Sequence, residues 1–94
     1  RALEYAERVQ QIVGTQPHAG DYWATATVAE AFLIQKKYAD AARLYQAAVA
    51  MARFETGSHA STWTQACRLM AKLEPTPAEH GLVRAAFAHL PDCA

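Results

Sequence analysis

Six side chains in this sequence are of the types that most often bind metals or act as nucleophiles. They are four histidines and two cysteines: His18, His59, His80, His89, Cys67 and Cys93. A tight zinc site usually shows close pairs of ligands, such as C-x2-C or H-E-x-x-H, because one short segment then presents both to the same ion. The sequence contains no such pair. We therefore predict no metal site and no cofactor, and expect the histidines at the surface and at helix ends.

The same residues give no local sign of nucleophilic catalysis. His89 and Cys93 are four residues apart, but Pro91 is expected to end the helix that would align them. If His59 and Cys67 share a helix, they lie about 12 Å apart along its axis, beyond hydrogen-bond reach. A glycine-rich phosphate loop and a G-x-S-x-G segment are also missing. We therefore expect a protein that is not an enzyme.

The number of cysteines indicates whether the protein occupies a reducing or an oxidising compartment. Two cysteines are too few for a disulfide framework, and in an alanine-rich helical chain they are expected to be reduced. Cys67, between Trp63 and Met70, has the setting of a small buried hydrophobic residue. The sequence thus predicts an intracellular, cytoplasmic protein. Apolar runs such as residues 31–34 are too short to cross a membrane or to form a signal-peptide core.

Length and charge narrow the classes of partner. The 94 residues suit one small domain with a single core. Nine basic and nine acidic residues cancel, so the broad attraction that nucleic acids and anionic membranes require is lacking. We predict neither partner. Because the chain begins with Arg1, we expect it to be a fragment of a longer protein.

The positions of glycine and proline divide the chain into helical segments. Alanine is the commonest residue and the strongest helix former, and nearly all of the four glycines and four prolines fall between segments with helical periodicity. The predicted fold is all-α with about five helices. These are expected over residues 2–13, 22–35 and 38–52, then from a cap at Ser58 or Ser61 to Pro75, and from Thr76 to Pro91.

Several helix ends have specific signals. Gly14 is a plausible stop for the first helix, and Asp21 can cap the second by accepting from free backbone N–H groups. Gly57 is expected to end the third helical region. The stretch from Thr76 to Glu79, T-P-A-E, has the pattern of a capping box, with proline at the first helical position.

Small and aromatic residues alternate along the predicted third helix. Short connections make consecutive helices pack antiparallel as hairpins. Helices approach closely only where the side chains at their crossing are small. We therefore predict that Ala41 and Ala48 are contact points with the neighbouring helix, and that Tyr38 and Tyr45 are large side chains packed beside them.

From Thr25 to Arg53 the chain resembles a tetratricopeptide repeat, with the clearest repeat over residues 22–53. The matching positions are the pair that replaces Leu-Gly, the aromatic residue of the first helix, the turn residue and three residues at the expected spacing on the second helix. They are Val28, Ala29, Phe32, Tyr38, Ala41, Tyr45 and Ala48. Thr25, Lys36 and Arg53 depart from the pattern, replacing a tryptophan, a common glycine and the closing proline. The resemblance implies stacked antiparallel hairpins in a right-handed arrangement.

A second resemblance lies in residues 22–31, YWATATVAEA, and residues 61–65, STWTQ. Together they are similar to the TRAFs-binding domain family, named for the helical regulatory region of the apoptosis signal-regulating kinases and found also in bacterial proteins. This resemblance implies a regulatory interaction segment beside a separate catalytic or signalling domain.

The repeat resemblance also implies a partner-binding face on the first helix of the pair. Its candidate residues are Trp23, Ala26, Thr27, Glu30, Leu33 and Ile34. The lysine and asparagine residues with which some members clamp a carboxylate terminus are missing, so a chaperone-tail receptor is disfavoured. An ordinary alternative is that Trp23, Leu33 and Ile34 pack on the first or fourth helix.

The leading functional hypothesis is a protein-protein interaction module that binds another protein or another domain of its own chain. Two alternatives belong to other classes. One is a structural spacer in a solenoid between functional domains. The other is a small-ligand sensor with a pocket between helices, to which Glu30 or His59 would contribute polar groups.

Overall fold

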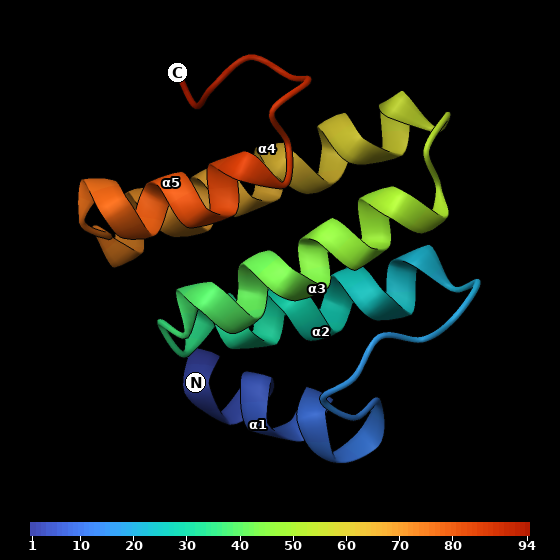
Figure 1. The fold of residues 1–94 in the computed structure, drawn as a ribbon. Helices are drawn as coiled ribbons and strands as arrows, with labels where there is room; N and C mark the ends of the chain where they lie inside the picture. Colours follow the sequence, from blue (N-terminus) through green and yellow to red (C-terminus); the bar gives the residue numbers. More distant parts are fainter.

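The five segments with helical periodicity all form α-helices in the computed structural model, which describes residues 1–94 (Figure 1). No strand is present. The prediction of an all-α domain of about five helices is confirmed. The helices are α1 (Ala2–Ile12), α2 (Tyr22–Ile34), α3 (Tyr38–Met51), α4 (Thr56–Leu73) and α5 (Pro77–Ala85).

Two of these helices begin with the capping interactions that the sequence predicted. The Asp21 carboxylate accepts from the Ala24 N–H (3.1 Å) at the start of α2. At α5, the Thr76 hydroxyl accepts from the Glu79 N–H (3.2 Å), and the Glu79 carboxylate accepts from the Thr76 N–H (2.8 Å). Both helix starts could be predicted because a cap depends only on residues within one turn.

The start of α4 corrects the sequence prediction. This helix begins at Thr56, so Gly57 lies in its first turn, and neither Ser58 nor Ser61 caps it. Glycine is tolerated there because the first N–H groups of a helix have no intrahelical partner. The extra turn is held by tertiary contacts: the Ser58 carbonyl accepts from the Tyr22 hydroxyl (3.2 Å) of α2, and the next residue, His59, is buried.

The end of α5 also differs from the prediction. The regular helix stops at Ala85, and the chain continues as tight turns in which the N–H groups of Ala86, Phe87 and Leu90 each bond to a carbonyl three residues earlier. Phe87 is nevertheless fully buried. Burial therefore continues past the end of the regular helix, although Leu82 within α5 is 46% exposed.

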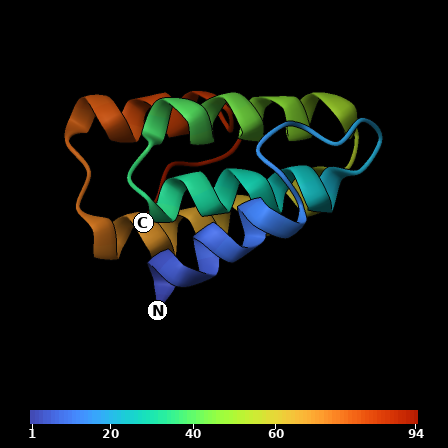
Figure 2. The same cartoon turned by 90° about the horizontal axis from the view of Figure 1, so that it is seen from below.

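The helices form three layers (Figures 1 and 2). The hairpin of α2 and α3 lies in the middle, α1 covers one side against α2, and the hairpin of α4 and α5 covers the other. In this outer hairpin, α4 faces α2 and α5 faces α3. The main core lies between the hairpins, and a smaller cluster of Ala6, Val9, Ala31 and Ile34 joins α1 to α2.

The small residues of α3 are where the sequence predicted them. Ala41 and Ala48 are 0% and 1% exposed, and Ala48 packs with Tyr22 and Ala26 of α2. We call Ala26, Ala48 and Ala52 the alanine seam, because these side chains let α2 and α3 approach closely. Tyr45 is 1% exposed and meets Phe87 edge to face, with ring centroids 5.3 Å apart.

The alanine seam leads to the first prediction. Replacing Ala48 by leucine inserts extra methylene groups where the helices are in contact, and overpacking of this kind typically costs about 1–3 kcal/mol. The free energy of unfolding, measured by urea denaturation, should fall by that amount. Ala50→Leu is the matched control, because Ala50 is on the same helix but exposed, and it should change stability by less than about 0.5 kcal/mol. Equal effects of the two variants would contradict the seam.

A second prediction concerns the turn between α2 and α3. Lys36 has a φ of 62°. Its own N–H donates to the Leu33 carbonyl and the Lys37 N–H donates to the Phe32 carbonyl, in the pattern of a glycine-type helix end. Left-handed backbone costs an ordinary residue about 1–2 kcal/mol. Glycine relieves this but loses about 0.4–1 kcal/mol through the unfolded chain. Lys36→Gly should therefore raise the free energy of unfolding by about 0.5–1 kcal/mol, and the melting temperature by a few degrees.

Lys37→Gly is the control for this substitution. Lys37 is the adjacent lysine, but its φ of −93° is ordinary. Glycine has no conformational strain to relieve at that position, so the variant should be no more stable than the unmodified protein. Greater stabilisation by Lys37→Gly than by Lys36→Gly would contradict the strain argument.

Candidate functional site

Four of the six residues predicted for a partner-binding face lie together in a cleft between α2 and α4. The cleft has a volume of about 210 Å³. We call it the α2–α4 cleft, and its lining residues are Trp23, Ala26, Thr27, Glu30, Tyr45, Ser61, Thr62 and Gln65. The walls come from two helices far apart in sequence, and the side chain of Tyr45 from α3 contributes to the lining.

The other two predicted residues are part of the core. Leu33 is fully buried between the hairpins, and Ile34 packs against α1 with Ala6 and Val9. The reason is that α2 is the central helix and is covered on several sides, so its apolar residues do not define one free face. Leu33 and Ile34 therefore pack against other helices and do not form a free face. Trp23, in contrast, is 57% exposed.

Trp23 is exposed, but its surroundings are well defined. Its ring meets Tyr22 edge to face, with centroids 4.9 Å apart. The Tyr22 hydroxyl lies 2.7 Å from the Thr62 hydroxyl of α4, and burial raises the pKa of Tyr22. Trp23 therefore stands at the rim of the cleft beside a tyrosine that joins α2 to α4.

Glu30 lies in the same cleft and forms no ion pair within the chain. Burial raises the pKa of its carboxyl group above the ordinary value. The pKa of the neighbouring Tyr45 is also raised, first by burial and then by the charge of Glu30. The cleft thus holds a partly desolvated carboxyl group that has no ion-pair partner within the chain.

All seven residues that match the repeat pattern are buried. They are Val28, Ala29, Phe32, Tyr38, Ala41, Tyr45 and Ala48. Of these, the hydroxyl of Tyr38 has no hydrogen-bond partner. Thr25, which replaces the tryptophan of the pattern, is also buried, and its hydroxyl accepts from the His18 N–H (2.9 Å) of the preceding loop. In this chain, Thr25 thus helps to hold the connection from α1.

The cysteine prediction is wrong in this structure, because Cys67 and Cys93 form a disulfide. The chain turns back after α5, and Pro91 is fixed to α4 by a hydrogen bond from the Trp63 indole N–H to its carbonyl (2.8 Å). The bridge spans 26 residues, which corresponds to about 3.5 kcal/mol of stabilisation in the loop-entropy description. The two cysteines meet only through the α4–α5 hairpin, so their spacing in sequence gives no sign of the contact. The cytoplasmic location stays a prediction.

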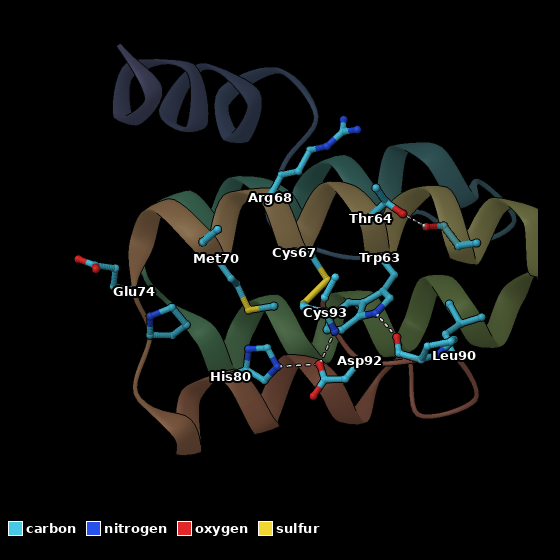
Figure 3. Close-up of a pocket in the computed structure, with 15 residues that line it drawn as sticks. Trp63, Thr64, Cys67, Arg68, Met70, Glu74, His80, Leu90, Asp92 and Cys93 are labelled. Carbon is cyan, nitrogen blue, oxygen red and sulfur yellow. Dashed lines mark hydrogen bonds and ion pairs between the residues drawn. A yellow bond between two sulfur atoms is a disulfide. The ribbon is translucent and has the colours of Figure 1, made fainter.

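A second cavity, of about 770 Å³, lies beside this disulfide between α4 and the segment after α5 (Figure 3). Both cysteines line it, together with His80 and Asp92. His80 Nε2 is 2.9 Å from Asp92 Oδ1. The hydrogen bond from His80 and that from the Cys93 N–H lower the pKa of Asp92. Sequence reasoning missed this cluster because His80 and Asp92 are brought together only by the turn after α5.

His59 and His89 form a separate pair on another face. His59 is 1% exposed, and its Nε2 lies 2.7 Å from the Ala52 carbonyl oxygen. A carbonyl can only accept, so this nitrogen carries the proton. In the neutral ring, Nδ1 then accepts from His89 Nε2 at 3.0 Å. Both nitrogens of His59 are engaged, which makes this histidine a link between the end of α3, α4 and the segment after α5.

No family model, curated protein sequence or solved structure matches this chain. The resemblances to the tetratricopeptide repeat and to the TRAFs-binding domain family therefore depend on the residues quoted above. None of the five helices has the length and hydropathy of a membrane-spanning segment.

The environment of Glu30 leads to the third prediction. A carboxyl group whose pKa is raised by folding stabilises the folded state below the ordinary pKa, and this contribution is lost as the pH rises through the ordinary and the raised values. Glu30→Gln removes the ionisation. The free energy of unfolding of the variant minus that of the unmodified protein should therefore be more positive at pH 7 than at pH 4. Urea denaturation of both proteins at both pH values measures this difference.

The control is Glu7→Gln, which makes the same chemical change at an exposed position of α1. Its effect on stability should differ less between pH 4 and pH 7 than that of Glu30→Gln. A Glu30→Gln effect that is the same at the two pH values would contradict burial of this carboxyl group.

Proposed function

We propose that this chain is a non-catalytic protein-protein interaction module of the tetratricopeptide-repeat type, which binds a partner protein or a neighbouring domain through the α2–α4 cleft. The observation that carries the proposal is the pairing of an exposed tryptophan, Trp23, with an unpaired carboxylate, Glu30, in one cleft. Tryptophan is among the residues most enriched at the energetic centres of interfaces.

The fold supports this type of module. Two helical hairpins lie one on the other, and the residues that match the repeat pattern lie in the core that joins them. In repeat proteins the hairpins serve as a rigid frame, and binding residues lie on the surfaces between them. The resemblance to the TRAFs-binding domain family fits a regulatory role for such a surface.

The size of the cleft favours a protein side chain over a whole small molecule. Sites for small ligands usually have volumes of about 300–1,000 Å³, whereas this cleft has about 210 Å³. The sensor hypothesis also named His59 as a polar contributor, but both of its nitrogens are already engaged. The α2–α4 cleft is therefore better suited to one side chain that projects from a partner.

The chemistry of the cleft specifies that side chain. Glu30 favours a lysine or arginine, because a cation would pair with a carboxylate that burial has already partly desolvated. The ring of Trp23 at the rim offers a second attraction to a cation within about 6 Å of its face. The polar side chains of Ser61 and Gln65 on the opposite wall supply hydrogen-bonding groups. The partner segment is thus expected to be basic, with apolar neighbours that cover Trp23.

The fourth prediction tests this binding mode. The folded chain is immobilised and used to select peptides from a random displayed library. The selected peptides should share a lysine or arginine next to an apolar residue. Their affinity, measured by calorimetry with synthetic peptides, should fall at least about tenfold for Trp23→Ala and for Glu30→Gln, as expected for an energetic centre that contributes 1.4 kcal/mol or more.

The control variant is Phe54→Ala. Phe54 is 90% exposed but lies outside the cleft, so its removal tests whether any exposed aromatic ring would serve. Circular dichroism establishes that each variant is folded. Peptides without a basic residue, or unchanged affinity for both Trp23→Ala and Glu30→Gln, would contradict the proposed function.

A further inference from the structure

The cavity beside the disulfide brings together four side chains that are common zinc ligands. Cys67 comes from α4, His80 from α5, and Asp92 and Cys93 from the segment after α5 (Figure 3). The ligand atoms of His80, Asp92 and Cys93 all lie within 4.8 Å of one another. Cys67 Sγ is covalently attached to Cys93 Sγ and is therefore part of the same group.

The nitrogen and oxygen ligands are spaced nearly as in a tetrahedral site, whereas the two sulfurs must move apart. Zinc–nitrogen and zinc–oxygen bonds of about 2.0–2.1 Å place two such ligands about 3.3 Å apart, and His80 Nε2 lies 2.9 Å from Asp92 Oδ1. Two zinc-bound thiolates lie about 3.8 Å apart, so the two sulfurs must move apart once their covalent bond is broken. This movement is small, and residues 91–94 have no helical structure to restrain it.

We propose that Cys67, Cys93, His80 and Asp92 form a zinc site when the disulfide is reduced. A dithiol reductant supplies two electrons and two protons: the Cys67–Cys93 bond breaks, two thiols form, and the reductant becomes a disulfide. Zinc then displaces the two thiol protons into the solvent. His80 releases to the solvent the Nε2 proton that it donates to Asp92 in the oxidised chain, carries its ring proton on Nδ1 instead, and binds through Nε2. Asp92, freed from that hydrogen bond, binds through a carboxylate oxygen.

The surrounding residues keep the ligands together after reduction. The Trp63 indole N–H donates to the Pro91 carbonyl (2.8 Å), which holds the tail on α4 independently of the disulfide. Arg84 lies near both Trp63 and Asp92. Its guanidinium carbon is 5.9 Å from the Trp63 ring centroid, and its Nε is 3.9 Å from Asp92 Oδ1. Two thiolates, one carboxylate and Zn²⁺ carry a net charge of −1, which the Arg84 guanidinium offsets.

The arrangement makes the zinc site and the disulfide alternatives. The disulfide consumes both thiols, which leaves only His80 and Asp92 for a metal ion. Reduction restores the full set of four ligands, a number and mixture typical of zinc. Both forms fasten the segment after α5 to α4, one through a covalent bond and the other through the ion. The site lies outside the α2–α4 cleft and shares no lining residue with it.

The experiment uses the whole chain in oxidised form, and in a form reduced with a dithiol that is then removed without air. Co²⁺ serves as a coloured probe for a zinc site. The reduced chain should bind one equivalent, with the intense visible bands of a tetrahedral ion and a thiolate charge-transfer band. The oxidised chain should show neither. Zn²⁺ should raise the melting temperature of the reduced chain and leave that of the oxidised chain unchanged.

Variants distinguish the four-ligand site from binding by two thiols alone. Competition with Zn²⁺ should show affinity losses of more than about tenfold for His80→Ala and for Asp92→Asn, since even an outer-sphere partner contributes about 10–100-fold. Asp40→Asn is the matched control, because Asp40 is a half-exposed residue of α3 outside the cavity, and it should bind zinc like the unmodified chain. A reduced chain without the charge-transfer band, or His80→Ala and Asp92→Asn variants that both bind as tightly as Asp40→Asn, would overturn the proposal.

Discussion

The close approach of α2 and α3 is the contact on which the rest of the structure depends. Ala48 and Ala26 allow it, because larger side chains at these positions would separate the two helix axes. The α2–α3 hairpin then offers two surfaces: α2 receives α1 on one side and α4 on the other, while α3 receives α5. Tyr45 and Phe87 fill the space between the hairpins. A wider separation would disturb the core and both walls of the cleft.

The central position of α2 also determines which of its residues line the cleft. Ile34 and Leu33 are covered by α1 and by the main core, whereas Trp23, Thr27 and Glu30 line the cleft toward α4. A helix that is covered on several sides is apolar nearly all round, so its sequence does not identify a free face. Glu30 is the one charged residue of α2, and it marks the side on which the packing is incomplete.

The sequence predicted features that depend on near neighbours along the chain. The caps at Asp21 and Thr76 and the burial of Ala41 and Ala48 follow from spacing within one or two turns. The start of α4 could not be predicted in this way, because Tyr22 and the burial of His59 hold its first turn against the local stop signal of Gly57. The disulfide and the cluster of His80 and Asp92 arise from the return of the chain after α5, which no local pattern specifies.

Helix α4 contributes residues to both the α2–α4 cleft and the cavity beside the disulfide. Thr62 and Gln65 line the α2–α4 cleft, while Trp63 and Cys67, one and two positions further along, face the cavity beside the disulfide. The first half of α4 is held to the central hairpin by the Tyr22–Thr62 contact and by the hydrogen bond of His59 to the Ala52 carbonyl. Its middle is held by Trp63 and by the bridge at Cys67. Because the α4 wall of the cleft depends on the placement of this helix, the cross-link to the segment after α5 supports that wall from behind.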